Sequence, residues 1–179
     1  GQNLCIRLSR EKDCTVLPFD IANEESELFE LLTKADRIVH LAGINRPLEP
    51  SEFMAGNFGL TSTIADALEK MQRPIPIIFS SSIQAELQND YGKSKRAAEE
   101  RLRVYNERTG APVRIFRFAN IFGKWCRPNY NSAVATFCYN IVHGLPLTIH
   151  DPGAPLQLVY IDDVVEAIVR ELKAELESF

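Results

Sequence analysis

Three side chains within the stretch SSSIQAELQNDYGKSK, residues 80–95, could transfer a proton. Tyr91 and Lys95 are four residues apart, so on a helix their side chains share one face. A free tyrosine has a pKa of about 10, and a nearby ammonium stabilises the phenolate and lowers that pKa. With Ser82 to hold a substrate oxygen, such a pair can pass a proton to or from a carbonyl/alcohol couple. The alternative is a surface tyrosine and lysine in the charged first turn of a helix.

Other polar stretches follow predicted strands, where a ligand can reach the backbone. HLAG (residues 40–43) has small residues that permit close approach, or it forms a tight strand-to-loop turn. Asp20 ends a strand, where its carboxylate can accept hydrogen bonds from ribose hydroxyls, or it caps the following helix. RFANIFGKWCRPNYNS (117–132) has cations, amides and rings that suit a phosphorylated, ring-bearing ligand, or it is a loop rich in turn-forming residues. We interpret His40 as a hydrogen-bonded histidine of the core or of a strand end.

Short apolar segments that alternate with amphipathic ones would position these residues. The predicted strands are residues 14–20, 37–43, 74–81, 112–120 and 147–150. The predicted helices are residues 25–36, 51–71 with Ser51 as a cap, 91–110, 132–144 and 162–176. The nearly continuous apolar strands favour a Rossmann-like α/β fold, a doubly wound parallel sheet with helices on both faces. In such folds ligands bind beyond the carboxyl ends of the strands, where the polar stretches fall.

Composition and charge limit the class of protein. The chain has 179 residues, of which 45% are hydrophobic and 25% charged, with a net charge of −4. This length fits one globular domain or a piece of a larger one. The mild net negative charge does not favour binding to nucleic acid or to an anionic membrane. No apolar run approaches the roughly 20 residues of a membrane span. Without a secretion signal we expect a cytoplasmic protein, with four reduced cysteines and no bound metal.

Taken in chain order, HLAG, Asn57, FSSS, YGKSK, RFANIFG and VYIDDVVEAIV resemble the extended short-chain dehydrogenase/reductase family of nucleotide-sugar epimerases, dehydratases and reductases. Within it, HLAGINRP, SSSIQA and FGKWCRPNYNSAVATFCY are similar to the reductase domain of the bacterial capsular-polysaccharide enzyme of UDP-N-acetyl-L-fucosamine synthesis. That family enzyme joins the reductase domain to a C-terminal cupin domain. The resemblance implies NAD(P)H-dependent reduction of the C4 keto group of a UDP-linked 6-deoxy amino sugar, by a homodimer.

The resemblance also implies a role for each matching residue. Tyr91 would protonate the nascent C4 alkoxide, and Lys95 would tune Tyr91 and bind the nicotinamide ribose. Ser82, rather than Ser81, would hold the keto oxygen. The residues implied for binding NADP or NAD are Gly1, Asp20, Leu41, Ala42, Gly43, Asn57, Ser80, Tyr91 and Lys95. Those implied for binding the UDP-sugar are Asn120, Lys124, Arg127, Asn129, Tyr130 and Asn131.

The chain departs from the family pattern at its start. The family opens with a strand and a Gly-x-x-Gly-x-x-Gly turn that receives the pyrophosphate, and Gly1 matches only the last of these glycines. Residues 1–14 read as a helix already in progress. We therefore expect residues 1–179 to be a Rossmann-like domain that lacks its first strand and glycine-rich turn, and to lack a cupin domain. Asp20 favours NAD(H), but this branch can use NADPH, so the cofactor choice stays open.

Two other functions remain open at this point. The first is a nucleotide-sugar 4-epimerase or dehydratase that holds NAD tightly. Dehydration is disfavoured, because Ile83 and Gln84 stand where a dehydratase of this family carries an acidic pair. The second is a non-catalytic nucleotide-binding module that senses the redox state of the cofactor. Such a module would not need the serine, tyrosine and lysine together.

Overall fold

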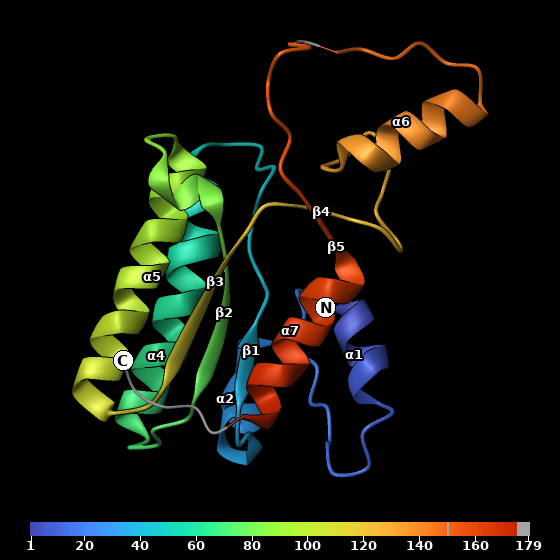
Figure 1. Cartoon of the computed structure of the whole chain (residues 1–179). Coiled ribbons are helices and arrows are strands. Elements are labelled where there is room, and N and C mark those ends of the chain that lie inside the picture. The colour runs from blue at the N-terminus through green and yellow to red at the C-terminus, as the bar shows by residue number, and fades with distance from the viewer. Residues whose placement is uncertain (150, 175–179) are drawn as a thin grey trace.

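The computed structural model describes residues 1–149 and 151–174, which form an α/β arrangement of helices and parallel strands (Figure 1). One sheet contains β1 (Ile38–His40), β2 (Ile77–Ser82) and β3 (Val113–Phe118), in that order and all parallel. A second sheet pairs β4 (Asn120–Phe122) with β5 (Leu158–Tyr160), also in parallel. These pairings confirm the predicted α/β class with parallel strands.

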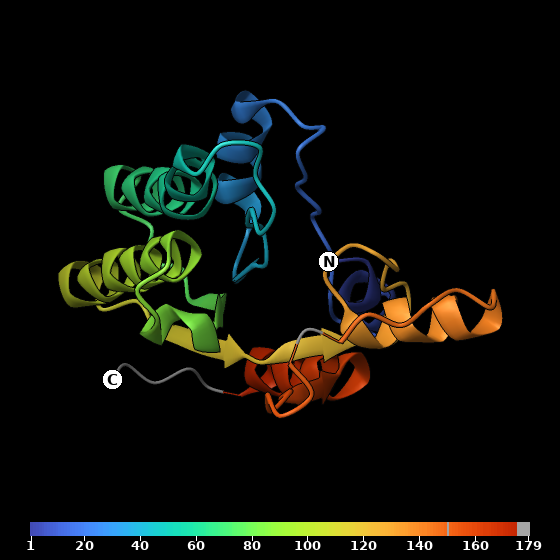
Figure 2. The same ribbon diagram turned by 90° about the horizontal axis from the view of Figure 1, so that it is seen from above.

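Helices cover both faces of the three-stranded sheet (Figure 2). The helical elements are α1 (Gln2–Leu8), α2 (Glu25–Lys34), α3 (Ser51–Phe53), the π-helical segment η1 (Met54–Gly59), α4 (Leu60–Lys70), the 3₁₀ segment η2 (Ile83–Glu86), α5 (Asp90–Thr109), α6 (Ala133–Val142) and α7 (Ile161–Lys173). Helices α2, α4 and α5 pack in one core, while α1 and α7 form a second core on the other side of β2. This two-sided cover is the doubly wound arrangement that the sequence predicts.

The side chains of β2 alternate between the two cores. Ile77 and Phe79 are fully buried among α2, α4 and α5, and Ile78 is buried among α1 and α7. A strand that is covered on both faces must be apolar at successive positions, which explains the run PIPIIF before the serines. The three serines follow where β2 leaves the core, so the strand delivers them to the carboxyl edge of the sheet.

Two of the predicted strands are wrong for the residues that the structure describes. Residues 14–20 form no strand, and most of their side chains are exposed. A strand exists through hydrogen bonds to a neighbouring strand, and within the described ranges this segment has no such partner. Residues 147–149 also form no strand, and residue 150 lies outside the described residues, as do residues 175–176 of the last predicted helix.

The predicted helix over residues 51–71 is built from three successive segments, α3, η1 and α4. The predicted cap at Ser51 is wrong, because Ser51 is the first residue of α3 and makes no capping hydrogen bond. The side chain of Glu52 instead accepts hydrogen bonds from the main-chain N–H groups of Leu48 and Glu49, at 3.4 and 3.3 Å. Asn57, inside the π-helical segment, is 1% exposed. This unusual turn therefore carries a buried amide towards the end of β1.

Three properties of the described part of the chain bear on membrane insertion, metal binding and disulfide formation. None of its helices is long and apolar enough to cross a membrane. It holds no group of three or more His, Cys, Asp or Glu side chains placed to bind a metal ion. Its four cysteines are free thiols, as predicted.

Candidate active site

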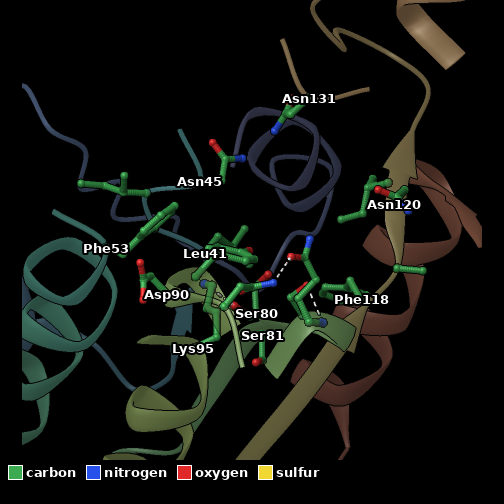
Figure 3. Close-up of a pocket in the computed structure, with 18 residues that line it drawn as sticks. Leu41, Asn45, Phe53, Ser80, Ser81, Asp90, Lys95, Phe118, Asn120 and Asn131 are labelled. Atoms are coloured by element: carbon green, nitrogen blue, oxygen red, sulfur yellow. Dashed lines mark hydrogen bonds between the residues drawn. The ribbon is translucent and has the colours of Figure 1, made fainter. Parts of the chain in front are cut away.

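A cleft of about 610 Å³ opens beyond the carboxyl ends of β1, β2 and β3 (Figure 3). Its walls come from the loop after β1, the end of β2, the first turns of α5 and the segment that joins β3 to β4. The predicted site residues that line it are Leu41, Gly43, Ser80, Ser82, Tyr91, Lys95, Asn120 and Asn131. Parallel sheets bind ligands at this edge, so the cleft lies where the fold favours a site.

Lys95 is buried against the end of β2. Its Nζ atom donates a hydrogen bond to the main-chain oxygen of Ser80 at 3.0 Å and lies 5.0 Å from the centroid of the Phe79 ring. Burial lowers the pKa of Lys95 to about 8, and the negative charge of Glu99 opposes this shift. An ammonium group has three donors. The bond to Ser80 therefore leaves donors that ligand hydroxyls in the cleft can use.

Tyr91 lies one turn before Lys95 and beside Ser82. Burial raises the pKa of Tyr91, and the hydrogen bond with the Ser82 hydroxyl opposes that rise. The net lowering of this pKa that the sequence predicts is therefore not found, because burial has the largest effect on it. The Tyr91 ring also packs at 5.7 Å from that of Phe53. A raised pKa keeps the phenol protonated at neutral pH, as a proton donor must be.

Of the neighbouring serines, the structure brings Ser82 beside Tyr91. Successive side chains of a strand point to opposite faces, and the hydroxyl of Ser81 donates to the carboxylate of Glu99 at 2.6 Å. Ser82 Oγ accepts a hydrogen bond from the main-chain N–H of Gln84 at 3.2 Å, which starts η2. Ser82 is thus the serine whose hydroxyl can share a substrate oxygen with the phenol.

Asn57 joins the loop after β1 to α5 from behind the cleft. Its side chain exchanges two hydrogen bonds of 2.9 Å with the main chain of Ile44 and donates to Ser94 Oγ at 2.9 Å. Ser94 Oγ in turn donates to the main-chain oxygen of Tyr91 at 2.7 Å. Asn57 does not line the cleft. This predicted cofactor-binding residue therefore holds the residues around the cleft in place and does not face the cleft itself.

Gly43 is in close contact with Lys95 and Asn57. A Cβ atom at Gly43 would lie 3.0 Å from Lys95 Nζ and 2.6 Å from Asn57 Oδ1. Only glycine fits there without displacing one of these groups. The loop after β1 can therefore approach the lysine closely, and this space together with the lysine donors fits a ribose of a nicotinamide cofactor.

The start of α5 contains residues that the sequence interpretation did not identify. Asn89 Oδ1 accepts a hydrogen bond from the main-chain N–H of Gly92 at 2.6 Å and so caps the helix. A Cβ at Gly92 would lie 2.1 Å from the main-chain oxygen of Gln84, so a larger residue would push η2 away. Asparagine before a predicted helix is a signal that could have revealed this cap. Asn45, Phe53, Gln84, Asn89 and Asp90 also line the cleft.

The residues predicted to bind the sugar nucleotide fall into two groups. Asn120 and Asn131 line the cleft (Figure 3). Lys124 does not, and its Nζ pairs with the carboxylate of Asp162 at 2.7 Å. Asn129 also lies outside the lining, in a turn with φ of 56°, and Arg127 is an exposed residue of the same loop. The structure thus brings only part of this loop to the cleft.

Tyr130 connects two loops beside the cleft. Its hydroxyl donates to Asn45 Oδ1 at 3.4 Å, and Asn45 lines the cleft. The guanidinium of Arg46 lies 5.4 Å from the centroid of the Tyr130 ring, in cation–π contact. The loops that follow β1 and β4 therefore touch each other, which the separate sequence motifs could not indicate.

Asp20 forms a local turn outside the cleft. Its carboxylate accepts a hydrogen bond from the main-chain N–H of Ile21 at 2.7 Å, and its own N–H donates to Asn23 Oδ1 at 2.8 Å. The alternative that Asp20 caps the following helix is wrong, because α2 begins at Glu25. Two further predicted cofactor residues also lie outside the lining and are exposed, Gly1 and Ala42.

His40 is a hydrogen-bonded core histidine, which confirms the interpretation from the sequence. It is 4% exposed, and its Nε2 lies 3.0 Å from Thr61 Oγ1. Because the Thr61 hydroxyl donates to the main-chain oxygen of Asn57 at 2.7 Å, the His40 Nε2 carries the proton. Burial, assisted by the charge of Lys95, lowers the pKa of His40 to about 4. The ring is therefore neutral at physiological pH.

Comparison with known proteins places this site in a family. The family described as "NAD dependent epimerase/dehydratase family" matches residues 5–178. The chain is 49% identical over 178 residues to the UDP-2-acetamido-2,6-beta-L-arabino-hexul-4-ose reductase of Pseudomonas aeruginosa, which covers 99% of this chain and 48% of the relative. It is 33% identical over 92 residues to UDP-glucuronate 4-epimerase 1 of Arabidopsis thaliana, covering 49% of this chain and 21% of that protein.

Solved structures agree with this placement. The capsular polysaccharide assembling protein CapF from Staphylococcus aureus superposes with a TM-score of 0.85 at 42% identity, covering 97% of this chain and 47% of that chain. UDP-glucuronic acid 4-epimerase from Bacillus cereus, solved with UDP-glucuronic acid and NAD, has a TM-score of 0.77 at 21% identity over 97% of this chain and 62% of its own. The latter likeness is one of fold alone. The chain spans about half the length of the reductase and of CapF. It belongs to the NAD dependent epimerase/dehydratase family.

Proposed function

We propose that the chain carries out the NAD(P)H-dependent reduction of the C4 keto group of a UDP-linked 6-deoxy amino sugar, in the synthesis of a capsule or O-antigen precursor. The observation that carries this proposal is the 49% identity, across 99% of the chain, to a protein named as a reductase of a UDP-linked 4-keto sugar. The cleft supports the same chemistry, because it gathers a serine, a protonated tyrosine and a lysine at the end of β2.

Reduction of a ketone requires a hydride at carbon and a proton at oxygen. The reduced nicotinamide supplies the hydride when it is bound. The Tyr91 phenol donates the proton to the oxygen, since burial raises its pKa and keeps it protonated at neutral pH. Ser82, which interacts with the same phenol, holds the substrate oxygen in reach by a hydrogen bond.

Lys95 serves both the proton transfer and the cofactor. After transfer, Tyr91 is a phenolate, and the ammonium one turn away stabilises that charge. The donors of Lys95 that Ser80 does not use would hold ribose hydroxyls, in the space that Gly43 leaves open. A polar cleft wall with Asn120 and Asn131 would face the sugar nucleotide.

The proposal is tested with the protein in its natural full length. A UDP-linked 4-keto-6-deoxy amino sugar is added with NADPH or with NADH, and loss of the near-ultraviolet absorbance of the reduced cofactor is followed. We expect one cofactor oxidised for each ketone converted to an alcohol, which mass spectrometry of the sugar nucleotide would register as two added hydrogens. Failure to oxidise either cofactor would overturn the proposal. The faster of the two reactions would identify the cofactor.

A 4-epimerase is the second candidate, supported by the match to UDP-glucuronate 4-epimerase 1 over 92 residues. An epimerase oxidises its substrate at C4 and then reduces it again, so the cofactor returns to its starting state and stays bound through turnover. NAD that remains bound until denaturing extraction, with no net oxidation of added NADPH or NADH, would favour this function. Cofactor binding without turnover of any sugar nucleotide would instead favour a non-catalytic module.

The proposal extends to the organisation of the protein. Residues 1–179 would be an NAD(P)-binding Rossmann-like domain that works as a homodimer in the cytoplasm. The coverage of about half of the reductase and of CapF supports a longer polypeptide, and in our proposal a cupin domain follows in it. Intact mass of the natural protein, light scattering of the purified protein and cell fractionation would test these three points separately.

A further inference from the structure

A buried carboxylate lies directly behind the cleft. Glu99 follows Lys95 by four residues and Tyr91 by eight in α5, so the three share one face of the helix. The Glu99 side chain is 0% exposed. Carboxylates are almost never fully buried unless they are paired. The reduction proposed above gives this group no contact with the substrate, so its presence needs a separate explanation.

The partners of Glu99 come from three places in the fold. Ser81 in β2 donates to it at 2.6 Å, and Arg117 in β3 donates through Nε at 2.9 Å and through Nη2 at 2.7 Å. Arg103, one turn further along α5, donates at 3.3 Å. A two-point arginine–carboxylate pair fixes orientation as well as distance. The Glu99 carboxylate therefore connects α5 to both β2 and β3 by hydrogen bonds.

Ser81 stands between the two residues of β2 that meet the proposed catalytic face of α5. The main-chain oxygen of Ser80 accepts the hydrogen bond from Lys95, and the Ser82 hydroxyl lies beside Tyr91. The bond from Ser81 to Glu99 therefore fixes how β2 is placed along α5. A buried ion pair is often no more stabilising than apolar side chains of the same size. The hydrogen bonds of Glu99 are therefore better explained by the alignment of β2 with α5 than by a gain in folding stability.

The charge of Glu99 also reaches Lys95. Burial lowers the pKa of Lys95 and the Glu99 carboxylate raises it. Burial alone would raise the pKa of Glu99, but the hydrogen bonds from its arginine and serine partners bring it below the ordinary value, so the group is charged at neutral pH. Tyr91 in the same helix and His40 in β1 are both neutral at that pH. The carboxylate of Asp90 lines the same cleft as Lys95.

We propose that Glu99 is a positioning residue for the reduction, which holds the Tyr91–Lys95 face of α5 in register with Ser82 of β2. The inference rests on the proposed function. Glu99 acts through Ser81 and Arg117 and touches neither the sugar nor the cofactor. Its loss should therefore affect turnover more than substrate binding.

The first test compares two charge-removing substitutions in the full-length protein. Glu99→Gln keeps the shape of the side chain, and Glu69→Gln is the matched control, since Glu69 pairs with Arg101 at 2.8 Å and Arg108 at 3.2 Å between α4 and α5. We expect Glu99→Gln to lower kcat about tenfold or more, because small misplacements of reacting groups are costly, with KM changed less than about twofold. Glu69→Gln should keep kcat although it also loses an ion pair.

The second test separates alignment and charge from a merely structural role. The loss of activity at alkaline pH should move about half a pH unit lower in Glu99→Gln, because Lys95 loses a stabilising negative charge. Glu99→Asp, which restores the charge, should return this limb towards that of the unsubstituted protein. A structural role would lower the unfolding temperature but leave the pH profile in place. Unchanged kcat and an unchanged profile in Glu99→Gln would overturn the proposal.

A third measurement does not depend on activity. A carbon NMR titration of labelled lysines, with the Lys95 signal assigned by its loss in Lys95→Met, should give a lower Lys95 pKa in Glu99→Gln and no change in Glu69→Gln. If the unsubstituted protein reduces no 4-keto sugar, the proposed function fails and this titration alone decides the role of Glu99. If Glu99→Gln does not fold, Ser81→Ala removes one bond of the network, and a kcat lowered less than about twofold there would contradict the proposal.

Discussion

The Nζ atom of Lys95 lies 3.0 Å from the main-chain oxygen of Ser80, in the strand that ends at Ser82. This hydrogen bond ties the start of α5 to the carboxyl end of β2. Tyr91, one turn earlier on the same helix, then lies beside the Ser82 hydroxyl. The placement of one helix against one strand thus assembles all three groups of the candidate site.

Removing the phenol should abolish most of the activity. Tyr91→Phe keeps the ring that packs on Phe53 but has no proton to give, so kcat for the 4-keto sugar should fall by about 10²–10⁴-fold with little change in KM. Tyr105→Phe is the control, because the Tyr105 hydroxyl bonds to the main-chain oxygen of Ile75 at 2.9 Å away from the cleft. It should cost about 1 kcal/mol of stability and leave kcat unchanged. Full activity in Tyr91→Phe would contradict the assigned role.

Activity should fall as the pH rises through about 8, the pKa to which burial lowers Lys95. Above that pH the neutral amine no longer stabilises the Tyr91 phenolate that the reduction leaves behind. The measurement is kcat/KM for the 4-keto sugar as a function of pH, which reports the free enzyme. In Lys95→Arg the charge persists, so the residual activity should no longer be lost near this pH. An alkaline limb that is the same in both proteins would assign it to another group.

Folding stability should decrease as the pH falls from about 6.5 towards 4, because His40 is buried and neutral. Its pKa is about 4 in the folded protein, against 6.5 for an unperturbed histidine, so the unfolded chain takes up the proton first. At about pH 5.5 this linkage amounts to about 1 kcal/mol relative to about pH 7.5. Urea unfolding at the two pH values should show the loss in the unsubstituted protein and a smaller one in His40→Gln. His143→Gln controls for the loss of a histidine from an exposed position, and an equal loss in all three proteins would contradict the linkage.

Gly92→Ala should destabilise the protein, because the new Cβ would lie 2.1 Å from the main-chain oxygen of Gln84 and force η2 away from α5. We expect a cost of about 1–3 kcal/mol by urea unfolding, together with a lower kcat since η2 follows Ser82. Gly59→Ala is the helical control. There the nearest atom would be the main-chain oxygen of Met54 at 3.8 Å, an ordinary contact. Alanine at Gly59 should therefore be neutral or stabilise by up to about 1 kcal/mol, and equal costs at both sites would refute the packing argument.

Much of the fold follows from local pattern. The helices over α2, α5, α6 and α7 agree with the predicted ranges to within a few residues of their ends where the structure describes them, because apolar spacing and end signals such as Gly110 are local properties. The strand predicted at residues 14–20 failed for the opposite reason. A strand needs a neighbour, and composition alone cannot say whether one is present beside it.

The sequence by itself determined the identity and order of the chemical groups: serines at a strand end, then a tyrosine and lysine one helical turn apart. These depend on spacing along one chain segment, which helix and strand periods translate directly into shared faces. Only the tertiary structure decided that the Ser81 hydroxyl binds Glu99, and that Tyr91 is partly buried with a raised pKa. It alone revealed Glu99 beneath Ser81 and Arg117. Burial and hydrogen bonding between α5, β2 and β3 set these properties, and such contacts join residues that no local pattern brings together.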